Sequence, residues 1–247
     1  MLITKGLAGF GRYLMLMGKV FSLPEKWRMY LKQYVKEMAQ LGVDSIGIVL
    51  LISFFIGAVI CIQIKLNIQS PWMPAFTTGY TTREIMVLEF SSSIMCLILS
   101  GKVGSNIASE MGTMRVTQQI DALEIMGVNS ASFLILPKIM GMLTMMPFLV
   151  IFSIAAGFIG AYATALAGII TVDDLTLGLL HDFNQWFIWM SIIKSFVFAF
   201  IISSVSAYCG YTVEGGSIDV GKASTNAVVR SSMLILFADI FLTPLLS

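Results

Sequence analysis

The stretch IMGMLTMMPFLVIFSIAAGFIGAYATALAG, from Ile139 to Gly168, carries no charged side chain along its whole length. A helix needs about 20 mostly apolar residues to cross the hydrocarbon core of a bilayer, which is about 30 Å thick. This stretch therefore predicts a membrane-spanning helix with residues to spare. It is long enough to tilt, to kink at Pro147 or to project beyond the bilayer.

Small residues recur at every fourth position in the second half of this stretch. Such spacing lets another helix approach closely, and that helix can belong to the same chain or to a second copy of it. The residues concerned are Gly157, Ala161 and Ala165, and also Gly160, Thr164 and Gly168.

Four further apolar stretches have the length of a membrane span. The composition agrees, because 57% of the 247 residues are hydrophobic and 12% are charged, against about half and a quarter in soluble domains. We therefore predict an all-α integral membrane protein with one domain over residues 1–247 and a five-span region over 43–246. The predicted spans are 43–64, 84–103, 139–168, 187–209 and 228–246.

The basic residues predict the orientation, because they favour the cytoplasmic side of a membrane. With five spans, most of them fall before the first span, between the second and third, or between the fourth and fifth. The opposite loops hold only Lys65 and Arg83, and Lys194 lies inside the fourth span. The N-terminus is therefore expected in the cytoplasm and the C-terminus outside.

Residues 1–41 are expected to form an interfacial helical segment. Ser22, followed three residues later by Glu25, has the spacing of a capping box that starts a helix. Aromatic and apolar residues then fall on one helical face and charged residues on the other, which suits the plane of the headgroups and would also suit a helix packed on protein. The apolar face holds Trp27, Tyr30, Leu31, Tyr34, Val35 and Met38, and the charged face holds Lys26, Arg28, Lys32, Lys36 and Glu37.

Three charged residues lie at membrane depth, namely Glu89, Lys194 and Asp239. A charge there costs a few kcal/mol even on lenient insertion scales, so each should face protein or a wet cavity. Glu89 and Lys194 can form an ion pair that only holds two helices together. Alternatively they line a polar slot for a zwitterionic or anionic lipid headgroup.

The longest polar insertion runs from Gly101 to Ser130. Its second half predicts a short helix with Gly127 available as a left-handed cap. A helix with polar residues among apolar ones could dock into a groove of a soluble partner or could simply be a solvated surface helix. The polar residues concerned are Gln118, Gln119, Asp121 and Glu124.

Other function classes find little support. The segment GSIDVGK, Gly216 to Lys222, fits part of a phosphate-binding loop, but Ala223 follows where a hydroxyl should hold Mg²⁺. The sequence contains no hydrolytic motif, no CxxC pair, a single histidine and no Lys/Arg-rich block. We therefore expect a chain that is not an enzyme, with no bound metal or cofactor and no nucleic-acid partner.

Two long segments resemble the MlaE/YrbE permease family of MCE-associated lipid transporters. They are GKVGSNIASEMGTMRVTQQIDALEIMGVN, Gly101 to Asn129, and FLILPKIMGMLTMMPFLVIF, Phe133 to Phe152. The resemblance extends to Glu89, to the IKS tripeptide around Lys194, to GGSIDVGKAST from Gly215 to Thr225 and to the Asp239 region. Leu88 departs from it, because the best-known member has arginine there.

The resemblance implies an ABC permease subunit that moves phospholipid between the bacterial inner membrane and a tunnel of MCE-domain proteins. It implies a homodimer, a cytoplasmic ABC ATPase that binds the ATP and Mg²⁺, a periplasmic or cell-surface MCE-domain protein and, in some systems, a STAS-domain protein. The alternative is a proton-coupled secondary carrier of a lipid or amphiphile, with Glu89 as the titrating group.

The resemblance also implies two sets of site residues. Glu89 and Lys194 match the family's lipid-binding residues, and a coupling helix in the loop after the second span is expected to seat on the ATPase. Trp72, in a segment that departs from the family, is a further lipid-binding candidate of this chain. The expected coupling residues are Glu110, Arg115, Gln118, Gln119, Asp121, Glu124, Met126 and Gly127.

Overall fold

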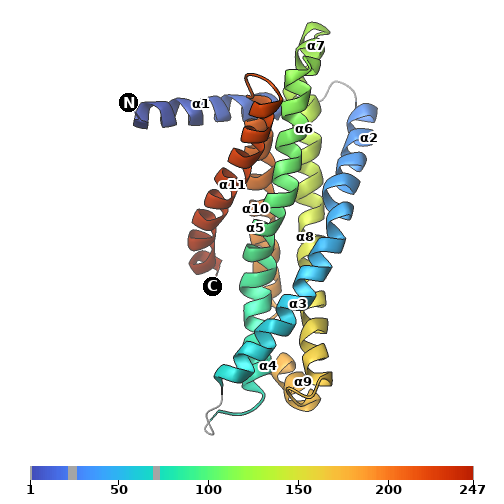
Figure 1. Ribbon diagram of the computed structural model, residues 1–247, viewed down its shortest axis with the longest axis vertical. Helices are drawn as coiled ribbons and strands as arrows, with labels where there is room; N and C mark the ends of the chain where they lie inside the picture. Colours follow the sequence, from blue (N-terminus) through green and yellow to red (C-terminus); the bar gives the residue numbers. More distant parts are fainter. Residues whose placement is uncertain (1, 22–26, 69–72, 247) are drawn as a thin grey trace. The chain divides into compact units, whose positions relative to one another are not determined.

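The computed structural model describes residues 2–21, 27–68 and 73–246, which form the helices in Figure 1. No β-strand occurs among these residues, so the predicted all-α class is confirmed. Three short segments, η1 to η3, are π-helical, with more residues per turn than an α-helix. The elements are α1 (Leu2–Val20), α2 (Trp27–Glu37), η1 (Met38–Val43), α3 (Asp44–Asn67), α4 (Thr77–Ile85), η2 (Met86–Ile94), α5 (Met95–Leu99), η3 (Ser100–Gly104), α6 (Ser105–Val116), α7 (Gln119–Ile125), α8 (Ser130–Leu166), α9 (Val172–Leu180), α10 (Trp186–Tyr211) and α11 (Ser217–Leu246).

Five helical stretches among the described residues are long and apolar enough to cross a membrane, which confirms the predicted number. Each extends beyond the apolar window, because backbone hydrogen bonds continue a helix where the side chains turn polar. The polar insertion, for example, is helical up to Val116. The stretches are Arg28–Asn67, Thr77–Val116, Ser130–Leu166, Trp186–Tyr211 and Ser217–Leu246.

The chain folds into two compact units, each built from three separate segments. Unit 1 consists of Met1–Val43, Ile98–Met145 and Phe198–Phe237. Unit 2 consists of Asp44–Leu97, Met146–Val197 and Ala238–Ser247. The helices α8, α10 and α11 each contribute residues to both units.

The N-terminal segment differs from its prediction. Only α1 is a separate helix, which runs crosswise to α6 in Figure 1. The helix α2 continues through η1 into α3 without a break, so residues 27–41 extend the first span instead of forming an interfacial helix. The capping-box residues Ser22 and Glu25 lie outside the described residues.

The buried face of α2 also differs from its prediction. Tyr30 and Glu37 are buried, whereas the apolar Leu31 and Val35 are exposed, as suits a lipid-facing surface. Glu37 was assigned to the charged face because its partner, Lys138, is distant in the sequence.

Glycines let α3 and α8 pack closely within unit 2. A Cβ atom on Gly57 would collide with the Gly157 backbone, and one on Gly160 would collide with the carbonyl of Phe54. Thr164 Oγ1 donates to Cys61 Sγ at 3.3 Å along the same seam. The predicted close approach is confirmed, and the partner helix belongs to the same chain.

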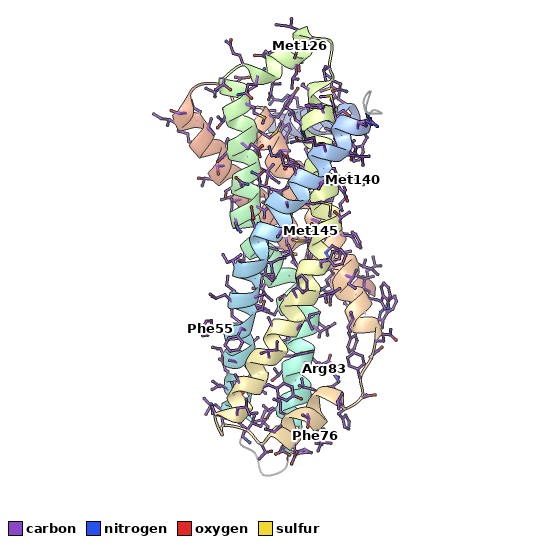
Figure 2. All side chains as sticks on the ribbon, turned by 90° about the vertical axis from the view of Figure 1, so that its right-hand side faces the viewer. Phe55, Phe76, Arg83, Met126, Met140 and Met145 are labelled. Carbon is purple, nitrogen blue, oxygen red and sulfur yellow. The ribbon has the colours of Figure 1, made fainter. Side chains whose placement is uncertain are left out.

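Arg83 joins α4 to the end of α9 in unit 2. Its guanidinium donates to the carbonyls of Leu179 (3.1 Å) and His181 (2.7 Å) and pairs with Glu84 Oε1 at 2.8 Å. The ring of His181 stacks on that of Phe76, and Figure 2 shows Phe76 and Arg83 in this region. A residue predicted to lie in a loop is therefore buried and supplies the carbonyl groups at the C-terminus of α9 with hydrogen bonds.

Candidate functional site

Lys194 of α10 joins its own helix to η2 and to α11 within unit 2. Its Nζ lies 3.0 Å from Asp239 Oδ1 of α11 and 3.6 Å from Glu89 Oε1 of η2. It also donates to the carbonyl oxygen of Leu88 at 3.4 Å. The structure therefore brings together the three charged residues that the sequence places at membrane depth.

The three side chains differ sharply in exposure. Lys194 is completely buried, Asp239 is 16% exposed and Glu89 is 45% exposed. The ammonium group of Lys194 donates a hydrogen bond to the Leu88 carbonyl and forms ion pairs with Asp239 and Glu89. Glu89 is therefore the charged group of the cluster that remains available to a ligand.

The π-helical geometry of η2 helps to build this site. The carbonyl of Leu88, which lies in η2, accepts from Ser92 Oγ at 2.7 Å and from Lys194 at 3.4 Å. Such bulges occur frequently at functional sites. The apolar pattern of residues 84–103 does not reveal this irregularity.

A chain of serines fixes η2 against α3 and α8. Ser53 Oγ donates to Ser153 Oγ at 2.8 Å, and Ser153 Oγ donates to Ser91 Oγ at 3.1 Å. Ser191 of α10 donates to the Val87 carbonyl at 2.6 Å. All four hydroxyls are buried, so their hydrogen bonds are shielded from water. These serines were not among the predicted site residues, although the three consecutive serines at 91–93 inside an apolar span are a signal for them.

The helix α7 belongs to unit 1 and has a left-handed residue next to each end. Gln118 precedes it with φ 60°, and Gly127 follows with φ 77°. The amide of Gly127 donates to the Glu124 carbonyl and that of Val128 to the Leu123 carbonyl, both at 3.0 Å. This pair of bonds is a Schellman motif, so the predicted capping role of Gly127 is confirmed.

The tip of α7 is apolar and exposed. Ile120 is fully buried and anchors the helix, whereas Ile125 and Met126 are 87% and 68% exposed. Figure 2 shows Met126 projecting at the end of unit 1 that carries α7. Ile125 was not among the predicted residues, because the docking role was inferred from the polar side chains of this segment.

The predicted charged residues of this segment are engaged within the chain. Arg115 pairs with Asp121 at 2.6 Å. Glu124 accepts hydrogen bonds from Ser130 and from Tyr211, each at 2.9 Å, and these donors lower the pKa of Glu124 below its ordinary value.

The remaining expected coupling residues differ in their exposure and contacts. Gln118 and Gln119 are exposed. Glu110 instead pairs with Lys138 at 2.6 Å. Trp72, the third expected lipid-binding residue, lies outside the described residues.

A second buried charge cluster lies in unit 1. Lys138 Nζ lies 2.9 Å from both carboxylate oxygens of Glu37 and 2.6 Å from Glu110 Oε2. Gln33 donates to Glu37 at 2.8 Å. The cluster ties α6 and α8, which flank α7, to α2. Sequence spacing gives no sign of it.

Comparison with known proteins supports a transport role. The family model described as Permease MlaE matches residues 34–245. A probable ABC transporter permease protein of Rickettsia bellii is 33% identical over 225 residues, covering 88% of this chain and 84% of that protein. The probable ABC transporter permease protein slr1045 of Synechocystis is 30% identical over 230 residues, covering 92% and 87%.

A plant protein of the chloroplast also matches. The protein TRIGALACTOSYLDIACYLGLYCEROL 1 of Arabidopsis thaliana is 30% identical over 230 residues, covering 88% of this chain and 62% of that protein. The family match over most of the chain, together with these relatives, shows that the chain belongs to the MlaE permease family and is a multi-pass permease subunit of an ABC transporter.

Proposed function

We propose that this permease subunit moves phospholipid between the bacterial inner membrane and a tunnel of MCE-domain proteins, driven by a partner ATPase. The observation that carries the proposal is the cluster of Lys194, Asp239 and the half-exposed Glu89 inside membrane-spanning helices. An exposed charged group at membrane depth costs free energy unless it binds a polar ligand, and a lipid headgroup is such a ligand. The plant relative, whose name is that of a glycolipid, is in keeping with a lipid substrate.

The partner ATPase would dock on α7. Its exposed Ile125 and Met126 offer an apolar contact surface. The left-handed residues Gln118 and Gly127 bound a short helix, which can transmit a displacement of the ATPase. ATP and Mg²⁺ would be bound by the ATPase. Nucleotide-driven closure would then favour one of two helix packings, and the lipid would follow the difference in affinity between them.

The full assembly follows the family resemblance. Two copies of the chain would form a homodimer whose N-termini lie in the cytoplasm and whose C-termini lie in the periplasm. An MCE-domain protein would receive the lipid outside, and a STAS-domain protein could accompany the ATPase.

The test is ATP-dependent transfer of a fluorescent phospholipid by the permease reconstituted with its ATPase and MCE partner. Glu89→Ala should reduce the transfer rate by about tenfold or more, as expected for the loss of one charge-assisted interaction, while the subunits still co-purify. Glu84→Gln is the matched control, because Glu84 lies in the same helical stretch but is paired with Arg83.

Two outcomes would count against the proposal. Unchanged transfer by Glu89→Ala would remove this residue from the mechanism. Transfer that continues without ATP and stops when the proton gradient is collapsed would favour a proton-coupled carrier with Glu89 as the titrating group.

A further inference from the structure

We infer that the site at Glu89 selects lipids whose headgroup carries a primary ammonium, such as phosphatidylethanolamine, over lipids with a net negative headgroup. The inference rests on the proposed function and names the substrate class of the same site. It is argued from the number of charges in the cluster, their exposure and the hydrogen bonds that they have already formed.

The cluster has a net negative charge. Lys194 is the single cation, and Glu89 and Asp239 are two carboxylates, so the formal charge is −1. Asp239 lies closer to Lys194, at 3.0 Å against 3.6 Å for Glu89. The uncompensated negative charge therefore belongs mainly to Glu89, which is also the most exposed of the three.

The cation of the cluster, Lys194, is not available to an anionic headgroup. A phosphate or a second anionic group would need to reach the ammonium of Lys194. That ammonium is completely buried, donates to the Leu88 carbonyl, and lies 3.0 Å from Asp239 Oδ1 and 3.6 Å from Glu89 Oε1. What a ligand meets at this cluster is thus a carboxylate, which only accepts hydrogen bonds.

The surrounding unit 2 carries an excess of acidic residues. The segments of unit 2 contain three basic residues and seven acidic ones, a formal charge of −4. Besides Lys194, the basic residues are Arg83, which is buried and hydrogen-bonded to carbonyls, and Lys65. Little in this unit compensates an anionic headgroup, and in a low-dielectric setting like charges repel over several ångströms.

A primary ammonium suits a site that has excess negative charge, no accessible cation and an acidic surrounding unit. It neutralises the excess charge, and its N–H groups donate to the carboxylate of Glu89 in a charge-assisted hydrogen bond. Its own phosphate can remain toward water, away from the acidic unit.

The experiment measures the headgroup composition of bound lipid. The permease, purified with its ATPase, is equilibrated with vesicles of equal parts phosphatidylethanolamine and phosphatidylglycerol, and the lipid retained after extraction is quantified by mass spectrometry. The bound ratio should favour phosphatidylethanolamine by about tenfold over the bilayer, the factor expected of one charge-assisted hydrogen bond. The Glu89→Gln variant should return the ratio to that of the bilayer.

Two further variants keep the inference falsifiable. Glu89→Asp retains the charge and should retain the preference, so a folding defect in Glu89→Gln does not decide the outcome. The control Glu84→Gln should leave the ratio unchanged, because Arg83 already pairs with Glu84. A wild-type ratio equal to that of the bilayer or favouring phosphatidylglycerol, or a preference that survives in Glu89→Gln, overturns the inference.

The same preparation separates this inference from the proposed function. ATP-dependent transfer of both lipids at equal rates would overturn the headgroup preference and leave the transport function intact. Absence of any ATP-dependent transfer by the complete system would overturn the proposed function itself.

Discussion

Replacing Lys138 by methionine tests whether the buried cluster of unit 1 is a true ion network. Lys138 is almost completely buried and contacts both oxygens of Glu37, which is fully buried, and one oxygen of Glu110, which is 22% exposed. Without the ammonium, Glu37 keeps the hydrogen bond from Gln33. Removing one partner of a buried pair usually costs about 3–5 kcal/mol, because an uncompensated charge stays buried.

We take the lower end of that range, about 3 kcal/mol, because Glu110 is partly exposed and can turn toward water. For a chain of this size, 1 kcal/mol corresponds to roughly 2–4 °C in Tm, so Lys138→Met should lower the apparent Tm by roughly 6–12 °C. The measurement is the fraction of soluble, monodisperse permease after heating in mild detergent, followed by size-exclusion chromatography.

Two variants serve as controls for this prediction. Lys222→Met breaks an exposed, solvent-screened pair with Asp219 and should leave the apparent Tm nearly unchanged. The double variant Lys138→Met, Glu37→Met removes the buried charges together and should recover most of the lost stability. A Tm for Lys138→Met equal to that of Lys222→Met would refute the ion network.

Further predictions concern the packing seam, the tip of α7 and its pH dependence. Gly57→Leu should prevent α3 from approaching the α8 backbone and reduce the yield of folded permease, which size-exclusion chromatography would measure; a normal yield would contradict the close approach. Ile125→Glu should reduce co-purification of the ATPase at least about tenfold with unchanged Tm, because the side chain is exposed; full retention of the ATPase would reject docking on α7. Glu124 has a pKa lowered by Ser130 and Tyr211, so its stabilising contribution is complete above its ordinary pKa of 4.5 and is lost as the pH falls through the lower folded value. The Tm difference between wild type and Glu124→Gln should therefore disappear in acid, and a constant difference between pH 7 and pH 3 would contradict this assignment.

Local features of the sequence predicted the spans and the cap of α7. The length of an apolar run is a local property, so five spans could be identified without any knowledge of their packing. Gly127 was predictable because a left-handed helix cap favours glycine for a local steric reason. The charged residues at membrane depth were predictable as candidates, because their burial requires a partner.

Pairing over long sequence separations was not predictable in the same way. Glu37 was expected on a charged face because Lys138, which compensates it, is 101 residues away. The contact of Lys194 with Glu89 and Asp239 likewise depends on how three helical segments pack. The start of the first span was predicted too late in the sequence, because polar residues were taken as the end of the span although no glycine or proline interrupts residues 28–41.

The π-helical segment η2 alters the phase of the helical stretch that contains it. Each such bulge accommodates about one residue beyond the α-helical repeat, so the residues that follow it are rotated by roughly 100° about the axis relative to an uninterrupted helix. A repeat of 3.6 residues counted without interruption from Glu89 therefore predicts the wrong helix face for the residues of α5 and α6. A homologue that lacks the bulge should align with a one-residue gap in this stretch, and removal of one residue from η2 should turn Glu89 away from Lys194 while the rest of the helix remains intact.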